Sequence, residues 1–263
     1  MDSAGILSKA APKLLEELTR PWAPARGESI VCAVSGGADS VALACLLAGL
    51  APGRGWSLSL VSVEHGLRGA AGERDARSVE ELAARLSLPC RILRADLAPG
   101  SSEAAAREAR HRLLEDFARS AGAVAVARAH TMDDQAETLL HRLTRGAGTA
   151  GLGAMTRRAK LRWRPLLGVR RASLRGFLEG SGVPWREDET NLAPEATRNR
   201  LRHVALPALE SAARRDVVPA LARAAELAAA DEALLGRLSV EALEGVVLAR
   251  GSESVECDLQ QLA

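Results

Sequence analysis

The residues best suited to chemistry lie in three short stretches, and the first is SGGADS, Ser35 to Ser40. It follows the apolar run SIVCAV and opens another, VALACLLAGL, which predicts a buried strand followed at once by a helix. Gly36 and Gly37 let the backbone turn tightly and come close to a ligand. The N–H groups at the start of the helix then point toward the same place, where the helix dipole favours an anion. The stretch therefore predicts a phosphate-binding loop.

Three side chains strengthen this phosphate-loop prediction. Ser35 and Ser40 add hydroxyl donors, and the carboxylate of Asp39 can hold Mg²⁺ against phosphates. No lysine follows as in GxxxxGKS, and the glycine spacing is not that of GxGxxG, so neither of those nucleotide sites is indicated. The alternative is an ordinary strand-to-helix turn with serine caps. The order of strand, glycine turn and helix favours the phosphate site.

The second stretch is HTMDDQAE, His130 to Glu137, at the end of a fourth apolar strand pattern. Asp134 and Glu137 are three residues apart, so on a helix their carboxylates share one face. Acidic residues in a first helical turn also complement the helix dipole, which is the structural alternative. Because His130 ends a strand, however, the acids should lie at the ligand edge of the sheet, and we favour a functional role.

The third candidate is a single arginine, Arg110. It lies in a row of helical spacing whose other members are apolar, namely Ala106, Leu113, Phe117 and Ala121. An arginine is costly to bury unless it meets an anion. Either Arg110 extends along the start of the helix to reach water, or it binds a phosphate, and we favour the phosphate.

Strand and helix patterns alternate along much of the chain and must position these residues. The predicted strands are 29–35, 57–65, 90–97 and 123–130, and the predicted helices are 38–50, 73–87, 101–122 and 132–146. Such alternation predicts an α/β fold, a doubly wound parallel sheet with right-handed crossovers and helices on both faces. Ligands of these sheets bind beyond the carboxyl ends of the strands, where the candidate residues lie.

The pattern changes after Gly146. A glycine-rich loop, 146–155, is followed by a predicted strand and helix, and then by a polar segment interrupted by proline. From about residue 210 the chain is alanine-rich and predicted to be helical to about Leu238, with a weakly patterned tail. We therefore divide the chain into a catalytic domain, 1–210, and a small helical segment, 211–263, which is either a natural short end or a truncation.

Composition limits the class of protein. The chain has 263 residues, of which 47% are hydrophobic and 26% charged, as is typical of a globular protein. No apolar run approaches the roughly 18 residues that span a bilayer, and the N-terminus lacks the apolar core of a secretory signal. The four cysteines are scattered without a CxxC pair, which argues for a reducing cytoplasm and against a zinc or iron–sulfur site.

Charge is unevenly distributed, although the net charge is only +2. Residues 157–215 hold fourteen Lys and Arg against six Asp and Glu, a net of +8. Residues 216–263 hold three against nine, a net of −6. A basic block of this density indicates a polyanionic partner. The alternative is a solvated, arginine-rich face.

The motifs together resemble a known family. SGGADS resembles the SGGxDS signature of the PP-loop ATP pyrophosphatases, whose fold is of the adenine nucleotide alpha hydrolase type. Further matches, in the family's order from residue 29 to about 210, narrow the resemblance to the tRNA(Ile)-lysidine synthetases. The matching stretches are EHGLRG (64–69), SSEAAAREARHRLL (101–114), AHTMDDQAET (129–138), RGAG (145–148), RPLLGVRRASL (164–174), WREDETN (185–191) and TRNRLRH (197–203).

The resemblance implies an enzyme that uses ATP and Mg²⁺ to join L-lysine to C2 of the wobble cytidine of tRNA(Ile) with a CAU anticodon. The cytidine oxygen would attack the α-phosphate of ATP, pyrophosphate would leave, and the lysine amine would then displace AMP. The implied catalytic residues are Asp39, Asp134, Glu137 and Arg110, with Asp39 and Asp134 as metal ligands. The implied nucleotide-binding residues are Ser35, Gly36, Gly37, Ala38, Asp39, Ser40, His65, Arg68 and one of Arg198 and Arg200.

Some departures from the family and two rival hypotheses stay open. Glu64, His111 and Thr131 differ from the residues usual at their positions, and many members continue into C-terminal tRNA-binding domains. One rival is a PP-loop tRNA sulfur transferase, which usually needs paired cysteines. The other is a truncated nucleotide-binding domain without activity. We expect a cytoplasmic protein without a membrane partner, and a homodimer remains an option.

Overall fold

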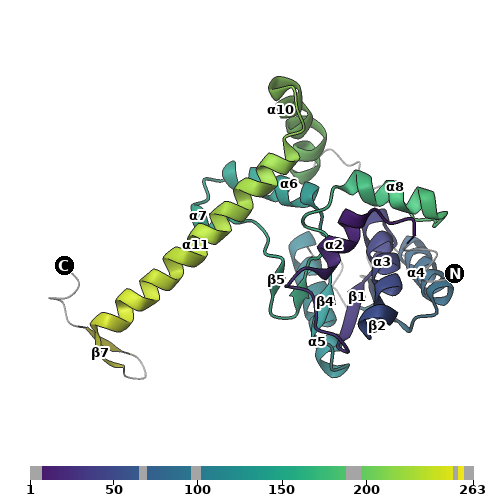
Figure 1. The fold of residues 1–263 in the computed structure, drawn as a ribbon, viewed down its shortest axis with the longest axis horizontal. Helices are drawn as coiled ribbons and strands as arrows, with labels where there is room; N and C mark the ends of the chain where they lie inside the picture. Colours follow the sequence, from purple (N-terminus) through teal and green to yellow (C-terminus); the bar gives the residue numbers. More distant parts are fainter. Residues whose placement is uncertain (1–7, 65–69, 96–101, 188–196, 251–253, 258–263) are drawn as a thin grey trace.

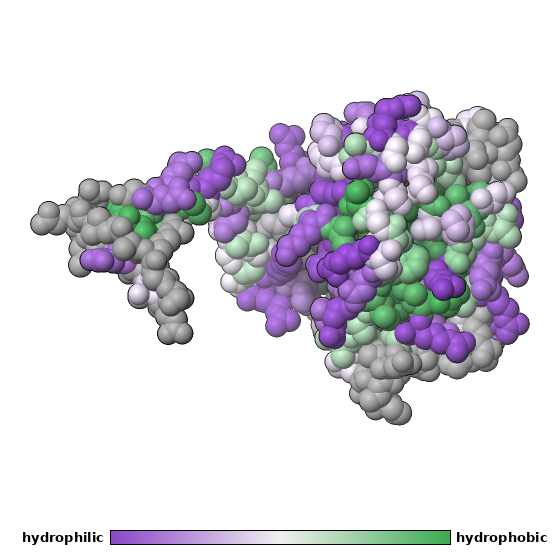
Figure 2. Space-filling model, turned by 90° about the horizontal axis from the view of Figure 1, so that it is seen from below, coloured by the Kyte–Doolittle hydropathy of each residue, from purple (hydrophilic) through white to green (hydrophobic). Residues whose placement is uncertain are grey.

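A computed structural model describes residues 8–64, 70–95, 102–187, 197–250 and 254–257 of the chain. Figure 1 shows a rounded α/β body from which one long helix extends, with a small β-hairpin at its far end. The space-filling view in Figure 2 shows the same arm standing clear of the body. No helix within the described residues is long and apolar enough to cross a membrane.

The body is built on a six-stranded sheet with the order β3-β2-β1-β4-β6-β5. The strands are β1 (Ser29–Ala33), β2 (Ser57–Glu64), β3 (Cys90–Arg94), β4 (Ala125–Ala127), β5 (Arg158–Ala159) and β6 (Arg162–Trp163). The first four strands and β6 pair in parallel, and of the strands described in this sheet β5 alone is antiparallel to its neighbour. The predicted doubly wound sheet is confirmed, with a short antiparallel edge strand that the sequence pattern did not predict.

Helices cover both faces of the sheet. Successive side chains of β1 point to opposite faces, and each face packs in a core of its own. Ile30 and Cys32 face the larger core, and Val31 faces the smaller one. The covering helices are α2 (Pro12–Thr19), α3 (Ala38–Arg54), α4 (Ala70–Leu86) and α8 (Arg171–Ser181) on the first face and α5 (Glu103–Ser120) on the second. Between these layers β1 and β4 run side by side, so their carboxyl ends meet at one edge.

A second group of helices surrounds α6 (Met132–Leu143), which follows β4. These are α7 (Thr149–Leu152), α9 (Thr197–Arg200), the π-helical turn η2 (Leu201–Ala205), α10 (Leu206–Ala213) and α11 (Val218–Val246). Ala136 of α6 packs against Leu206, Val217 and Val218 in a small core of its own. This core fixes the base of α11, the long helix of Figure 1, against α6.

The second half of the chain departs from the sequence-based boundaries in three places. The short helix α7 forms within the segment predicted as a loop, and the tail forms a hairpin of β7 (Val247–Arg250) and β8 (Val255–Cys257). The long helix α11 continues to Val246 instead of ending near Leu238, although Leu238 and Leu243 are exposed. Alanine and leucine favour helix even without packing, which explains the extension. The division of the chain at residue 210 stays a prediction.

Candidate functional site

The phosphate loop lies between β1 and α3, and its own hydroxyl groups hold its shape. The backbone N–H and the hydroxyl of Ser35 contact Ser40 Oγ at 3.1 and 3.2 Å. Ser40 Oγ in turn donates to the carbonyl of Gly37 at 2.9 Å. Gly36 has a φ of +84°, in the left-handed region, and a Cβ there would come within 3.1 Å of Ser78 Oγ. The loop therefore requires glycine at this position.

The helix after the loop begins without a side-chain cap. Ala38 and Asp39 are the first two residues of α3, and Gly37 precedes them. The first N–H groups of a helix have no partner within it, so an uncapped start can donate them to an anion. On the other side of the loop, the backbone N–H of Arg186 donates to the Gly36 carbonyl at 3.0 Å. This bond fastens the loop to the segment that follows α8.

Asp39, at the end of the phosphate loop, is linked to the acids of α6 through Arg171. Its Oδ2 accepts a hydrogen bond from Arg171 Nε at 3.0 Å. Its Oδ1 is buried and has no hydrogen-bond partner among the described residues. Burial raises the pKa of Asp39, against the lowering effect of Arg171. A buried carboxylate oxygen without a partner is unfavourable, and a bound cation would relieve it.

Asp134 and Glu137 share one face of α6, as their spacing predicted, and both are buried. Asp134 Oδ2 accepts from the backbone N–H and the hydroxyl of Thr131, each at 2.8 Å, and so caps the helix. Asp134 Oδ1 accepts from Arg171 at 3.0 Å and from Arg198 at 3.2 Å. One oxygen of the Asp134 carboxylate thus caps the helix, and the other contacts the arginines.

Glu137 is the most buried member of the site, with an exposed fraction of 0%. It accepts from Arg202 Nε at 2.7 Å, from Arg198 Nε at 2.9 Å and from Arg171 Nη1 at 3.5 Å. Three guanidinium groups thus converge on the carboxylates of the loop and of α6. We call this set the acid–arginine site; its members are Asp39, Asp134, Glu137, Arg171, Arg198 and Arg202.

Arg171 joins the phosphate loop to α6. Its guanidinium lies 3.0 Å from both Asp39 and Asp134 and 3.5 Å from Glu137, while its backbone N–H donates to Asp133 at 2.8 Å. Burial alone would lower the pKa of Arg171, but these carboxylates raise it. Among the described residues, no group of three or more His, Cys, Asp and Glu side chains is arranged to hold a metal ion.

Charges around the end of β4 act on two titratable groups. Burial would raise the pKa of Asp134, but Arg171 and Arg198 outweigh it and lower that pKa. His130 lies between Asp134 and a further set of arginines, and burial lowers its pKa to about 3. The imidazole is therefore neutral at neutral pH and adds no charge to the site.

Sequence reasoning named Arg198 and missed Arg171 and Arg202. Arg202 comes four residues after Arg198 in the continuous helical stretch of α9 and η2, so both lie on one face. That spacing was the signal that could have identified Arg202. Arg171 opens α8, far along the chain from the loop, and no local pattern distinguishes it from Arg170.

Several predicted site residues lie elsewhere. His65 and Arg68 are outside the described residues. Arg200 is exposed, whereas Arg198 meets the acids, so the structure distinguishes the two arginines of TRNR. A nucleotide-binding role for any of these residues stays a prediction.

Arg110 is exposed on α5, and its predicted place in a buried row was wrong. The buried residues of α5 are Ala106, Leu114 and Ala118, whereas Leu113 and Phe117 are half-buried and Ala121 is exposed. The stripe that packs on the sheet is therefore offset by one residue from the predicted one. Arg110 carries no cost of burial, and its contact with a phosphate stays a prediction.

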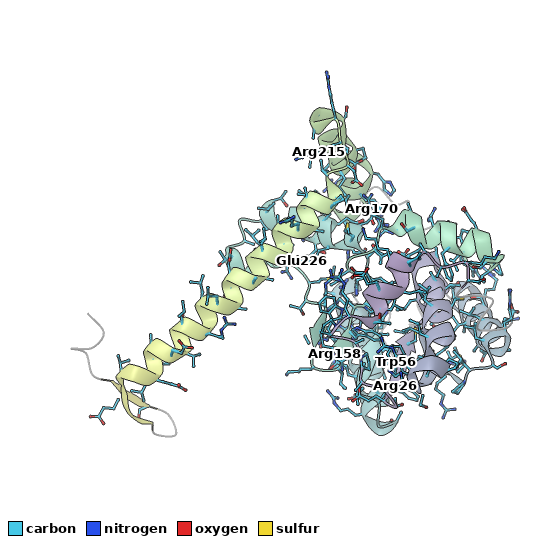
Figure 3. The ribbon with its side chains drawn as sticks, viewed as in Figure 1. Arg26, Trp56, Arg158, Arg170, Arg215 and Glu226 are labelled. Atoms are coloured by element: carbon cyan, nitrogen blue, oxygen red, sulfur yellow. The ribbon has the colours of Figure 1, made fainter. Side chains whose placement is uncertain are left out.

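The basic block 157–215 is engaged in part with carboxylates of the same chain. Arg170 pairs with Asp133 at 3.2 Å and also with Asp216 at the base of α11. Figure 3 shows Arg170 at this junction, whereas Arg215 lies beside α10, away from the sheet. Arg215 is exposed. Binding of a polyanion by this block stays a prediction.

The fold and the loop place the protein in the class of α/β domains that bind phosphate groups at the carboxyl edge of a parallel sheet. Residues 10–209 match the PP-loop domain family. The chain is 44% identical to a tRNA(Ile)-lysidine synthase of Solibacter usitatus, over 86% of this chain and 52% of that protein. It is 43% identical to a tRNA(Ile)-lysidine synthase of Salinispora tropica, over 86% of this chain and 70% of that protein.

The chain therefore belongs to the PP-loop domain family and, within it, to the tRNA(Ile)-lysidine synthases. It spans about half the length of the Solibacter relative, 52%. Among solved structures, the U34-tRNA thiolase NcsA from Methanococcus maripaludis superposes with a TM-score of 0.68 at 14% identity, covering 84% of this chain and 78% of that one. At this identity the likeness supports the fold alone.

Proposed function

We propose that the chain uses ATP to join L-lysine to C2 of the wobble cytidine of tRNA(Ile) with a CAU anticodon, releasing AMP and pyrophosphate. Its membership of the tRNA(Ile)-lysidine synthases supports the reaction and the tRNA. The observation that carries the proposal is the acid–arginine site. There Arg171 brings Asp39 of the phosphate loop to the acids of α6.

Mg²⁺ fits the carboxylates of this site. In nucleotide enzymes the ion is held by one or two carboxylates together with phosphate oxygens, so a cluster of three acids is not required. Asp39 offers a buried oxygen without a hydrogen-bond partner among the described residues. Asp134 Oδ1, which accepts from Arg171 and Arg198 here, would become a ligand when those arginines turn to the phosphates. When bound, the ion would supply positive charge at the phosphates. We propose these two residues as its ligands.

The three arginines of the site are proposed to stabilise negative charge on the α-phosphate. A guanidinium group meets two phosphate oxygens with the same fork of N–H groups that meets a carboxylate. Arg171, Arg198 and Arg202 are held by carboxylates and can exchange these for phosphate oxygens. Reactions at phosphorus depend mainly on such positioning and charge stabilisation.

Two steps account for the products. The cytidine O2 attacks the α-phosphate, the bond between the α- and β-phosphates breaks, and pyrophosphate leaves on the Ser35–Ser40 loop. The lysine ε-amine then attacks C2, a C–N bond forms, and AMP departs with the former O2. The ε-ammonium must lose a proton before it attacks. Asp134 and Glu137 are the carboxylates we propose to accept it.

The test is incorporation of radiolabelled lysine into tRNA(Ile) with a CAU anticodon, in the presence of ATP and Mg²⁺. One lysine should be incorporated for each AMP released, and omission of ATP should abolish incorporation. A tRNA whose wobble base is not cytidine is the matched control. Binding of ATP without any incorporation would refute the proposal and favour a nucleotide-binding domain that is inactive at this length.

The rival tRNA sulfur transferase finds little support in the cysteines. Cys32 and Cys45 are buried in the larger core, and burial raises the pKa of Cys45 to about 11. A reactive cysteine needs a lowered pKa and access to solvent. A sulfur assay on the same tRNA would separate the two reactions. A homodimer stays a prediction.

A further inference from the structure

A second group of cationic and basic side chains lies between α5 and the ends of β4 and β6. Its members are Arg107, His111, Arg128, Arg162 and Arg164, and we call it the α5 cationic cluster. Arg128 directly follows β4, and Arg164 directly follows β6. Arg162 pairs across the strands with Val126, which packs against α5. Because side chains alternate along a strand, all three strand-end arginines lie on the α5 side of the sheet.

Carboxylates balance little of the charge of the three strand-end arginines. Among the described residues, Glu115 is the acid paired with these arginines, 2.7 Å from Arg162 and 3.8 Å from Arg128. Glu115 is shared with the exposed Arg119, at 3.6 Å. Arg164 donates to the carbonyl of Thr156 at 2.8 Å, which satisfies one N–H without neutralising the charge. Arg128, Arg162 and Arg164 therefore carry more positive charge than Glu115 balances.

Two of the arginines are also buried. Arg128 and Arg164 have exposed fractions of 5% and 9%. Nε and Nη2 of Arg128 and Nε of Arg164 are buried and have no hydrogen-bond partner among the described residues. Burial lowers the pKa of Arg128 to about 10, and the charges of Arg162 and Arg164 act in the same direction. Buried N–H groups of a guanidinium that lack a hydrogen bond are unfavourable, so an anion bound here would stabilise the protein.

We propose that the α5 cationic cluster binds a phosphate group of the RNA strand, next to the nucleotide that reacts. In the sheet β4 lies on the side of β1 opposite β2, so the cluster is beside the phosphate loop and not within it. Arg107 is exposed and the Arg162 side chain is 41% exposed, so the cluster opens to solvent on one side. An open site suits a phosphate carried on a chain.

The two parts of this inference have different foundations. The anion site rests on two buried arginines, Arg128 and Arg164, that have N–H groups without a hydrogen bond among the described residues. Its assignment to RNA rests on the proposed function, because the phosphate of a nucleotide has the same chemistry. Direct contacts from arginine to the RNA backbone add to affinity and make it dependent on salt.

The experiment compares Arg128→Met and Arg162→Gln with the control Arg119→Gln. Arg119 is an exposed arginine of α5 that contacts the same Glu115, so the control removes one charge outside the cluster. Affinity for a fluorescent anticodon stem–loop RNA is measured over a salt series, and the melting temperature is measured with and without Mg·ATP. Both cluster variants should bind the RNA about tenfold more weakly, with a log–log salt slope smaller by about 0.7 to 0.9. Their Mg·ATP shift should equal that of the wild type, and Arg119→Gln should change neither quantity.

Each contrary result identifies a different error. Equal losses of RNA affinity and of the Mg·ATP shift would assign the phosphate to the nucleotide and overturn the RNA assignment. Unchanged RNA affinity and slope in both variants would show that the arginines only pack. If Arg128→Met does not fold, the more exposed Arg162→Gln decides the question.

The test of the RNA-phosphate site can be told apart from the test of lysine transfer. If the wild type incorporates no lysine while the variants still lose RNA affinity, the site stands and the reaction fails. If the variants incorporate lysine normally and bind RNA as the wild type does, the site fails and the reaction stands.

Discussion

The two arginine groups on either side of His130 differ in how their charge is balanced. In the acid–arginine site, three guanidinium groups meet three carboxylates at 2.7 to 3.7 Å. In the α5 cationic cluster, Arg128 and Arg162 share Glu115, and buried N–H groups of Arg128 and Arg164 have no hydrogen bond among the described residues. The guanidinium groups of the first site are therefore paired without a ligand, whereas two buried guanidinium groups of the second keep N–H groups without a hydrogen bond among the described residues.

This difference has consequences for binding. A ligand at the acid–arginine site must replace internal ion pairs, so only the difference between old and new contacts contributes to affinity. At the α5 cationic cluster, a phosphate can instead meet N–H groups of Arg128 and Arg164 that have no hydrogen bond among the described residues, so its binding stabilises the folded protein more directly. Substitutions in the first group should therefore affect stability and function together, whereas those in the second should affect binding with little loss of stability.

The largest effect is expected for Asp39→Asn. Loss of the carboxylate charge should lower the rate of lysine transfer by about 10³-fold, the scale seen when charge stabilisation at a reacting group is removed. Unlike the other members of the acid–arginine site, Asp39 should not lose stability when it is substituted, because burial raises its pKa above the usual 3.8. When a carboxyl group has a higher pKa in the folded protein than in the unfolded chain, the folded protein loses stability as the pH rises from the lower pKa to the higher one. Asparagine has no such proton to lose and avoids this loss.

The melting temperature of Asp39→Asn at neutral pH should thus equal or exceed that of the wild type. Transfer of labelled lysine and thermal unfolding measure the two effects on the same sample. Near-normal transfer by the folded variant would remove Asp39 from the catalytic site. A large fall in melting temperature would show that its pair with Arg171 outweighs its burial.

The second effect in size is the loss of stability expected for Glu137→Gln. Glu137 is fully buried and meets Arg171, Arg198 and Arg202. Removing one partner of a buried ion pair leaves charge uncompensated, and the free energy of unfolding should fall by about 3 kcal/mol. Chemical denaturation measures it, with the exposed Asp116→Asn as the control. Equal, small losses in both variants would show that the arginines find other partners.

A smaller effect should separate the two arginines of TRNR. Arg198 contacts the α6 acids, whereas Arg200 is exposed. If Arg198 turns to the phosphates of ATP, Arg198→Met should weaken ATP binding about tenfold, or about 1.4 kcal/mol. Arg200→Met, the matched control, should bind as the wild type does. Calorimetric titration with Mg·ATP measures both, and the reverse order would assign the contact to Arg200.

Patterns within short stretches of sequence predicted the phosphate loop and the acids of α6. The arginines of the site depend on how distant elements pack together. The turn at Gly36 follows from a glycine pair between an apolar strand and a helix, and the shared face of Asp134 and Glu137 follows from their spacing. The role of Arg171 depends on α8 returning across the sheet to the loop, which no local pattern encodes. Arg110 was placed wrongly because a one-residue offset in the stripe of α5 moves a side chain from the core to the surface.

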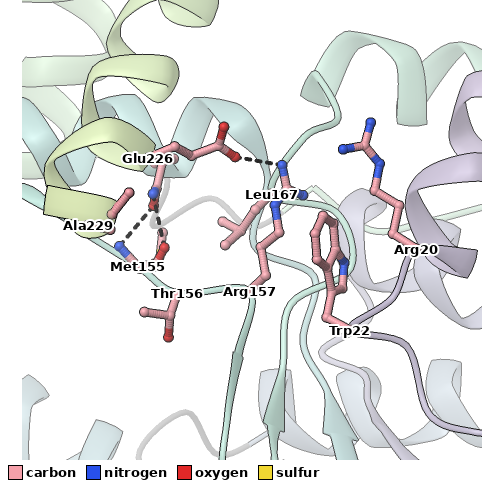
Figure 4. Close-up of a pocket in the computed structure, with 10 residues that line it drawn as sticks. Arg20, Trp22, Met155, Thr156, Arg157, Leu167, Glu226 and Ala229 are labelled. Carbon is pink, nitrogen blue, oxygen red and sulfur yellow. Dashed lines mark hydrogen bonds and ion pairs between the residues drawn. The ribbon is translucent and has the colours of Figure 1, made fainter. Parts of the chain in front are cut away.

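Arg157, where the body meets α11, allows a test within one residue of how burial changes the weight of an ion pair. It lines a groove of about 350 Å³ together with Trp22 and Glu226 (Figure 4). Its guanidinium carbon lies 4.7 Å from the centre of the Trp22 ring. It also pairs with Glu17 at 2.9 Å and with Glu226 of α11 at 2.6 Å. One arginine thus has a buried and an exposed carboxylate partner.

The smallest effect is expected for Glu226→Gln. The Glu226 side chain is 53% exposed, so water and salt screen its pair with Arg157, and the free energy of unfolding should fall by less than about 1 kcal/mol. The loss should shrink further at high salt. The Glu17 side chain is only 5% exposed, and Glu17→Gln should cost about 2 kcal/mol at either salt concentration, because it leaves a partly buried guanidinium without its interior partner. Urea denaturation of both variants at low and high salt measures the contrast. If the two variants lose the same amount with the same dependence on salt, burial does not set the weight of an ion pair here, and the distinction between the acid–arginine site and the α5 cationic cluster loses its physical basis.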